Sequence, residues 1–206
     1  GINLTNDFLK AVEEDADFRL IDPKTNEACK TINARSLWWQ ILNARAETGE
    51  PYMINIDTCN EALPEGQKDL GLKIRQSNLC SEITLVTNEE RTAVCCLSSV
   101  NLEHYDTWSK EPLFIADLIT MLDNVLQHFI DNAPDELFRA RFSAASERSL
   151  GLGAMGFHAY LQSKGIPFES ALAKSLNLKI FKNIPNIDFL GEIGVKYSNS
   201  LPLLIS

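Results

Sequence analysis

The stretch "SNLCSEITL" at residues 77–85 places a side chain capable of chemistry at every second position: Asn78, Cys80 and Glu82. In an extended chain alternate side chains project to the same face, so these three would lie side by side. A thiol can give up a hydrogen atom or act as a nucleophile, a carboxylate can take a proton from a substrate hydroxyl, and an amide can hold that hydroxyl. The spacing leaves two interpretations open, a reactive site and a strand with a polar face.

The other four cysteines are of two kinds. Cys29 and Cys59 stand alone and are best interpreted as small buried hydrophobic residues. Cys95 and Cys96 are adjacent, so in an extended run they face opposite sides and at most one of them shares a face with Cys80. Five cysteines without a repeating framework argue against a secreted disulfide scaffold and favour free or catalytic thiols.

A glycine motif and the histidines give weaker signals. Gly151, Gly153 and Gly156 spell GxGxxG, but "FSAASERSL" before them is a poor buried strand, and the nearest acid, Glu169, comes early for a dinucleotide site. We therefore expect glycines that permit a tight strand-to-helix turn and close packing. No CxxC occurs and the three histidines are scattered, so no metal site is expected.

Composition disfavours two kinds of partner. The chain carries 28 acidic and 19 basic residues, a formal charge of -9, which argues against a nucleic acid held through its phosphates. No apolar run reaches the roughly 18 to 20 residues that cross a bilayer, and no signal segment opens the chain. We expect a soluble cytoplasmic protein with no membrane partner.

Hydrophobic periodicity predicts the elements that must position these residues. Thr5 is suited to cap a first helix, in which Phe8, Leu9 and Val12 recur at helical spacing. The segment "ARSLWWQILNARAETG" predicts a second helix that ends at Gly49. "PYMINID" then predicts a short strand.

The second half predicts further helices and a second extended segment. Apolar residues repeat at i, i+3 and i+4 over residues 112–132, with Ser109 as the cap, Val125 on the apolar stripe and His128 off it. A shorter helix over 155–163 should end before Gly165. "TAVCCLSSVNL" predicts the extended segment, which could form a hairpin with 77–85 or flank a longer loop between barrel strands. Strands alternating with such helices predict an α/β fold with largely parallel strands.

Several segments together resemble one protein family. "SNLCSEITL", followed 15 residues after Cys80 by Cys95 in "AVCCLSSVNL", resembles the active-site region of the large (α) subunit of ribonucleotide reductase, most like the class I type. "TGEPYMINIDTCN" and "ERSLGLGAMGFHAYL" resemble stretches at the corresponding places of that family. The resemblance implies part of a ten-stranded αβ barrel, with a partial catalytic barrel domain at 1–184. It does not extend to a divergent tail at 185–206, in which Pro185 would interrupt the preceding helix.

The resemblance also implies a role for each site residue. Cys80 matches the cysteine that becomes a thiyl radical on a finger loop and abstracts the 3'-hydrogen of the ribonucleotide. Glu82 matches the base that takes the 3'-hydroxyl proton, and Asn78 matches an amide of the substrate site, beside which Ser77 is assigned to substrate binding. Cys95 matches one of two thiols that reduce the substrate and end as a disulfide, which leaves Cys96 outside the reaction.

The same resemblance implies what must come from elsewhere. It implies a radical from a metal-containing small (β) subunit, thioredoxin or glutaredoxin as the reductant, and ATP or deoxynucleotide effectors that bind outside this segment. No cofactor is expected to be bound by this chain. The partner of Cys95 has no counterpart here, so we expect the chain to be inactive without the remainder of the α chain. The alternative is a non-catalytic barrel fragment or degenerate gene product that acts at most as an interaction module.

Overall fold

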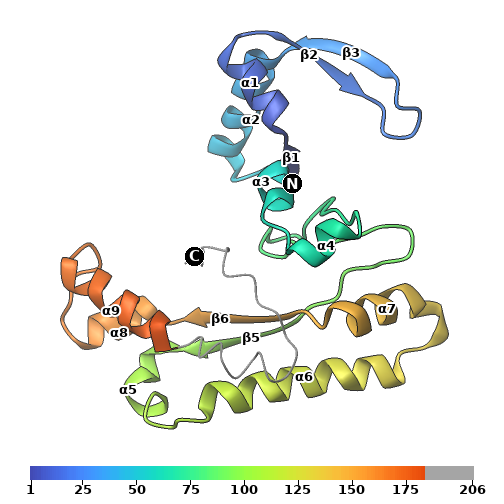
Figure 1. Cartoon of the computed structure of the whole chain (residues 1–206). Coiled ribbons are helices and arrows are strands. Elements are labelled where there is room, and N and C mark those ends of the chain that lie inside the picture. Colours follow the sequence, from blue (N-terminus) through green and yellow to red (C-terminus); the bar gives the residue numbers. More distant parts are fainter. Residues whose placement is uncertain (184–206) are drawn as a thin grey trace. The chain divides into compact units, whose positions relative to one another are not determined.

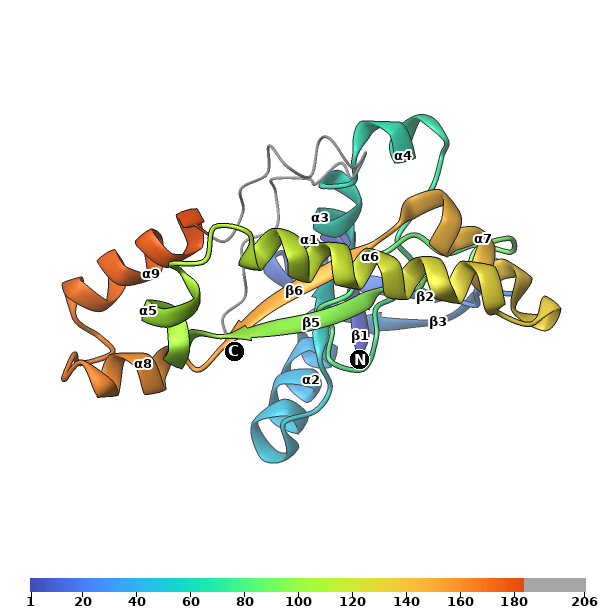
Figure 2. The same ribbon diagram turned by 90° about the horizontal axis from the view of Figure 1, so that it is seen from below.

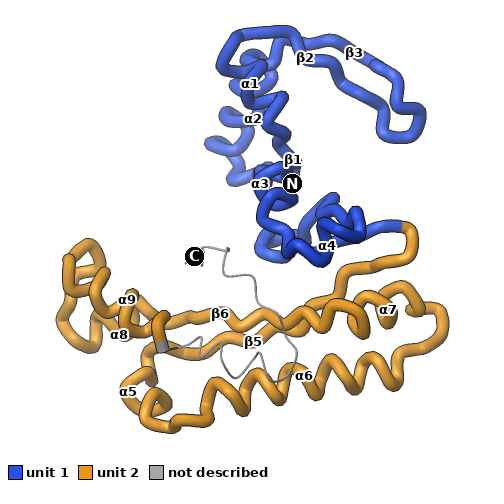
Figure 3. Tube along the Cα trace, in the orientation of Figure 1, with its two compact units in different colours: residues 1–88 blue, residues 89–206 orange. Residues whose placement is uncertain are grey.

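The structure is a computed structural model that describes residues 1–183, so the predicted tail at 185–206 and its Pro185 lie outside the described residues. The chain divides into two compact units, Gly1–Asn88 and Glu89–Ser206, which are coloured separately in Figure 3. Cys80 belongs to the first unit and Cys95 to the second. Each unit is described by itself.

The first unit combines short strands with two longer helices. β1 and β4 pair in parallel, and β2 and β3 form an antiparallel hairpin that extends beyond the helices in Figure 1. The elements in order are β1 (Ile2–Leu4), α1 (Asn6–Glu13), β2 (Asp17–Ile21), β3 (Ala28–Asn33), α2 (Ala34–Thr48), β4 (Met53–Asn55), α3 (Ile56–Glu61) and α4 (Glu65–Asp69).

Local signals set the ends of the first two helices as predicted. The Thr5 hydroxyl accepts a hydrogen bond from the Phe8 amide at 3.2 Å and caps α1. α2 ends at Gly49, whose φ of 79° lies in the left-handed region that glycine enters without strain. The apolar faces of both helices pack in one core around Leu4, Phe8, Ala11 and Ala34.

The second unit is built on one parallel strand pair. β5 and β6 pair in register from Cys96 opposite Leu150 to Asn101 opposite Met155, and α6 contacts both strands along their length in Figures 1 and 2. The elements in order are β5 (Cys96–Asn101), η1 (Leu102–His104), α5 (Tyr105–Trp108), α6 (Phe114–Asn132), η2 (Asp135–Leu137), α7 (Phe138–Glu147), β6 (Leu150–Met155), α8 (Phe157–Ser163) and α9 (Ala171–Asn183).

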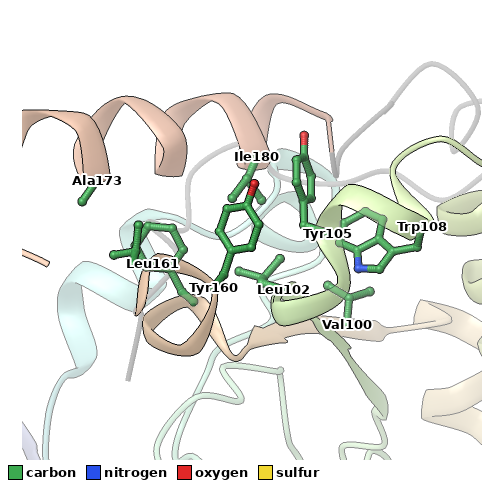
Figure 4. Packing of buried hydrophobic residues seen from close by; sticks show 9 residues of the cluster. Val100, Leu102, Tyr105, Trp108, Tyr160, Leu161, Ala173 and Ile180 are labelled. Carbon is green, nitrogen blue, oxygen red and sulfur yellow. The ribbon is translucent and has the colours of Figure 1, made fainter. Parts of the chain in front are cut away.

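The core of this unit lies at the carboxyl end of the strand pair. Figure 4 shows Val100 of β5 beside Leu102, with the aromatic rings that follow in α5 and with side chains of α8 and α9. Trp108 donates its ring N–H to the Asn101 carbonyl oxygen at 2.9 Å, and the Tyr160 hydroxyl donates to Asp106 at 2.9 Å. The buried aromatic residues therefore have partners for their polar atoms.

Three predictions about helices need correction. Ser109 does not cap α6, because it follows α5, which the buried Tyr105 and Trp108 hold in the core. Val125 is 53% exposed although it lies on the predicted apolar stripe, because the described contacts of α6 cover only a narrow strip of the helix. The helix predicted from residue 155 begins at residue 157, since Met155 still belongs to β6.

Candidate active-site loop and thiol strand

The segment 77–85 is a loop with a turn, so the predicted strand is wrong. The Ser81 amide donates to the Asn78 carbonyl oxygen at 3.2 Å, and Ser81 has a φ of 68°, which interrupts any alternation of side chains. The Asn78 side chain favours this turn, because its oxygen accepts a hydrogen bond from the Ile83 amide at 3.1 Å. The strand that follows, β5, pairs with β6. Because residues 77–85 and β5 belong to different units, the hairpin considered between them stays a prediction.

The turn nevertheless brings the predicted site residues together by another route. The Asn78 amide nitrogen donates to a carboxylate oxygen of Glu82 at 2.6 Å, and the Ser77 hydroxyl donates to the Ile83 carbonyl oxygen at 2.6 Å. These bonds close the base of the turn, and the exposed Cys80 lies between Asn78 and Glu82. A carboxylate, an amide and a thiol are thus presented on one short loop.

Both ends of this loop are fixed to the body of the first unit. The Asn60 side chain accepts from the Ile74 amide and donates to the Ile74 and Ile56 carbonyl oxygens, each at 2.9 Å. At the other end the fully buried Val86 packs with Ile56, Leu63 and Ile74. The loop between these two anchors is therefore held at its ends, while its apolar Leu79 is 86% exposed.

Asn60 is a positioning residue that the sequence analysis missed. It lies in the quoted segment "TGEPYMINIDTCN", but nothing near it in the sequence indicates a partner at Ile74. The three hydrogen bonds of its side chain are formed only because α3 packs beside the start of the loop. The only indication of the role of Asn60 was its polar side chain at the end of a short helix.

The adjacent thiols of the second unit have different surroundings, in line with their predicted opposite directions. The Cys95 sulfur lies over the backbone of Gly151, 3.5 Å from where a Cβ at that residue would stand. Cys96 lies under the influence of Asp123 of α6, and its pKa is raised first by burial and then by that carboxylate. Cys95 therefore lies beside Leu97 and Gly151, whereas Cys96 is a half-buried thiol held in its protonated form.

The glycine motif has a structural role within a strand. Gly151 and Gly153 lie inside β6, paired with Leu97 and Ser99, and only Gly156, with a φ of 78°, makes the turn into α8. The tight turn predicted for all three glycines is therefore wrong for two of them, while the close packing is confirmed. A Cβ at Gly151 would lie 2.3 Å from a methyl carbon of Leu97. This arrangement differs from a dinucleotide fingerprint, in which the first glycine ends the strand.

Within residues 1–183 no group of three or more His, Cys, Asp or Glu side chains could hold a metal ion. In the same part of the chain, no helix has the length and apolar character that crossing a bilayer requires.

The family is shown by comparison with known proteins. The family model described as "Ribonucleotide reductase, barrel domain" matches residues 1–187. The chain belongs to this family. The resemblance seen in the sequence is thereby confirmed, as is the α/β fold that forms part of the ribonucleotide reductase barrel.

The region matched by ribonucleotide reductase relatives covers most of this chain but only a part of each relative. A "Ribonucleoside-diphosphate reductase large subunit" of Invertebrate iridescent virus 3 is 59% identical over 165 residues, which cover 80% of this chain and 26% of that protein. A "Putative ribonucleoside-diphosphate reductase large subunit" of Frog virus 3 is 51% identical over 187 residues, covering 89% of this chain and 33% of that protein.

A solved ribonucleotide reductase structure shows the same fold. The "Actinobacillus ureae class Id ribonucleotide reductase alpha subunit" superimposes with a TM-score of 0.74 at 34% sequence identity. The match covers 89% of this chain and 33% of that chain. The chain thus spans about a quarter to a third of the length of these relatives.

Proposed function

We propose that this chain carries the thiol and carboxylate chemistry of a ribonucleoside-diphosphate reductase large subunit, and acts when joined to the remainder of that subunit. The observation that carries the proposal is the turn in which Asn78 binds Glu82 at 2.6 Å with Cys80 between them. Family membership adds support, because the family model matches residues 1–187, a range that contains all three residues. Anchoring of the loop at both ends suits a site whose reacting groups must be held in place.

The proposed roles are those that the family resemblance implies, and each of them suits the chemistry of its group. As a thiyl radical, Cys80 takes the 3'-hydrogen atom from the ribose and becomes a thiol, while Glu82 accepts the 3'-hydroxyl proton. Asn78 holds Glu82 and contacts the substrate together with Ser77. Cys95 and a second thiol outside this chain supply two electrons and two protons, the 2'-hydroxyl leaves as water, and the two sulfurs join as a disulfide. Cys80 then returns a hydrogen atom to the 3'-carbon and is a thiyl radical again, and Glu82 returns its proton to the 3'-oxygen.

This balance requires partners that we include in the proposal. The starting radical comes from a metal-containing small (β) subunit, and a dithiol protein such as thioredoxin or glutaredoxin returns the disulfide to two thiols after each turnover. The second thiol and the binding sites for ATP or deoxynucleotide effectors belong to the remainder of the α chain. The proposed setting is the cytoplasm.

A graft into a complete relative tests the proposal. Residues 1–183 replace the matching segment of the Invertebrate iridescent virus 3 large subunit, and deoxyribonucleotide formation is measured with that virus's small subunit and a dithiol. We expect turnover by the graft and a loss of at least about a thousandfold in the Cys80→Ser variant, because its hydroxyl cannot replace the thiyl radical. The matched control is Cys29→Ser, which changes an exposed thiol of β3.

Two outcomes would count against the proposal. Undiminished turnover by the Cys80→Ser graft would remove Cys80 from the radical role. An inactive graft with unaltered Cys80, in a folded subunit that still binds its partner, would favour the non-catalytic alternative. For Cys95, the Cys95→Ser graft should lose dithiol-dependent turnover, and normal cycling would exclude it from the disulfide.

A further inference from the structure

A nearly buried ion pair joins the start of the second unit to the end of α7. A guanidinium nitrogen of Arg91 lies 3.9 Å from a carboxylate oxygen of Glu147, and the two side chains are only 13% and 8% exposed. The Arg91 guanidinium also lies over the ring of Phe142, 4.7 Å from its centre. One helix therefore holds this cation from two sides, by a charge and by an aromatic face.

The surroundings of the pair are short of other polar partners. Two guanidinium nitrogens of Arg91, a carboxylate oxygen of Glu147 and the hydroxyl of Ser143 are buried without a hydrogen bond. Burial raises the pKa of Glu147, and Arg91 acts in the opposite direction. Each charge is thus compensated chiefly by the other, and removing either one would leave a buried charge without its partner.

This pair stands four residues before Cys95 in the chain. Within that short segment the Thr92 amide donates to the Arg139 carbonyl oxygen of α7 at 3.4 Å. Four residues span at most about 14 Å when fully extended, so this short length of chain transmits a displacement of Arg91 to Cys95. The segment lies along α7 at its start and reaches β6 at its end, where the Cys95 sulfur lies over Gly151.

A second ion pair fixes the junction between α7 and β6. Arg148, with a φ of 44°, donates to Asp123 of α6 at 2.6 and 3.0 Å and to Gln127 at 2.7 Å. Glu147 and Arg148 are adjacent in the chain. Through Glu147 the junction contacts the segment that leads to Cys95, and through Arg148 it contacts α6. Figure 1 shows α7 leading directly into β6 at this junction.

We infer that Arg91 and Glu147 are positioning residues that hold the Cys95 thiol against β6. The inference rests on the proposed function, in which Cys95 must lie in a fixed place so that the second thiol can join it in a disulfide. Neither Arg91 nor Glu147 touches the substrate in this scheme. When one member of the pair is replaced, residues 91–95 move so that the remaining charge reaches water. The Cys95 thiol moves with this segment.

The test measures thiol positions without any substrate. The 206-residue chain is treated with iodoacetamide under native conditions, and the alkylation rates of Cys80, Cys95 and Cys96 are followed by peptide mass spectrometry. In Glu147→Gln, Cys95 should react roughly ten times faster relative to Cys96, because its segment opens locally. Arg91→Lys keeps the positive charge and should retain most of the protection of Cys95 against alkylation. Arg91→Gln should behave like Glu147→Gln.

The matched control removes an ion pair from the same helix. Arg141→Gln breaks the contact of Arg141 with Asp135, whose side chain is 96% exposed, and should leave all three rates unchanged. An unchanged Cys95 rate in Glu147→Gln would overturn the inference. An equal rise for Cys80, Cys95 and Cys96 would also overturn it, because the pair would then support the fold as a whole. The alkylation rates involve no turnover, so they test the positioning of Cys95 independently of the grafting experiment.

Discussion

Replacing Gly156 by alanine should destabilise the second unit through two separable effects. Gly156 has a φ of 78°, and alanine in the left-handed region costs about 1–2 kcal/mol. The lower freedom of alanine in the unfolded chain offsets about 0.4–1 kcal/mol of this, which leaves about 1 kcal/mol. A Cβ here would also stand 2.3 Å from the Asn101 side-chain oxygen, which caps η1 by accepting from the Glu103 amide at 3.0 Å.

Displacing that cap adds the second effect. Loss of an asparagine cap costs about 1 kcal/mol, so Gly156→Ala should lower the free energy of unfolding by about 2 kcal/mol in total. Gly165→Ala is the matched control, because Gly165 has a φ of 65° but nothing within 4 Å of an added Cβ. It should lose about 1 kcal/mol, the cost of the backbone conformation alone.

Urea unfolding of the 206-residue chain, followed by tryptophan fluorescence, measures both variants. An Asn101→Ala variant completes the comparison: it should cost about 1 kcal/mol in the parent and much less beside Gly156→Ala, where the cap is already displaced. Equal losses for Gly156→Ala and Gly165→Ala would refute the reasoning, because the contact with Asn101 would then cost nothing.

Two further predictions concern titration. Asp123→Asn should lower the pKa of Cys96 by removing a nearby negative charge, seen as faster alkylation at a given pH, and an unchanged pH profile would contradict this. Burial and the hydrogen bond to Asp106 raise the pKa of Tyr160 to about 12. The neutral phenol therefore stabilises the fold fully below about pH 10, and this contribution is lost as the pH rises toward 12. Tyr160→Phe should flatten the loss of stability measured by urea unfolding above about pH 10, and parallel curves would count against the assignment.

Features fixed by near neighbours in the sequence were predictable. Thr5 caps a helix because an amide three residues later is within its reach, and Gly49 ends α2 through its own backbone freedom. Ser109 has the right residue type for a cap but ends α5 and does not begin α6, because the bond of Trp108 to the Asn101 carbonyl oxygen helps to hold α5 in the core. A cap therefore follows from sequence only when tertiary packing does not compete with it.

The three residues of the predicted site lie on one short loop, but the predicted strand geometry is wrong. The sequence analysis placed Asn78, Cys80 and Glu82 on one face of a strand, whereas a turn joins Asn78 to Glu82. Asn78 itself carried the missing signal, because asparagine binds nearby backbone and so competes with extended structure. The catalytic roles of these residues remain predictions.

Long-range contacts account for what the sequence could not supply. Gly151 and Gly153 have the composition of a turn but lie in β6, because side chains of β5 fill the space beside them. The contact of Arg91 with Glu147 joins two segments that have no common motif. In both cases the partner lies on another element, so neither spacing nor residue type could identify it.

The contact between Gly151 and Leu97 limits which sequences this sheet accepts. A side chain at position 151 would stand 2.3 Å from Leu97 and 3.5 Å from the Cys95 sulfur. Leu97 is exposed, so position 151 can gain a side chain when the end of the Leu97 side chain turns away or when the residue at position 97 becomes smaller. The residue at position 151 and the rotamer at position 97 are therefore coupled, so a larger side chain in β6 is accommodated by a change in β5.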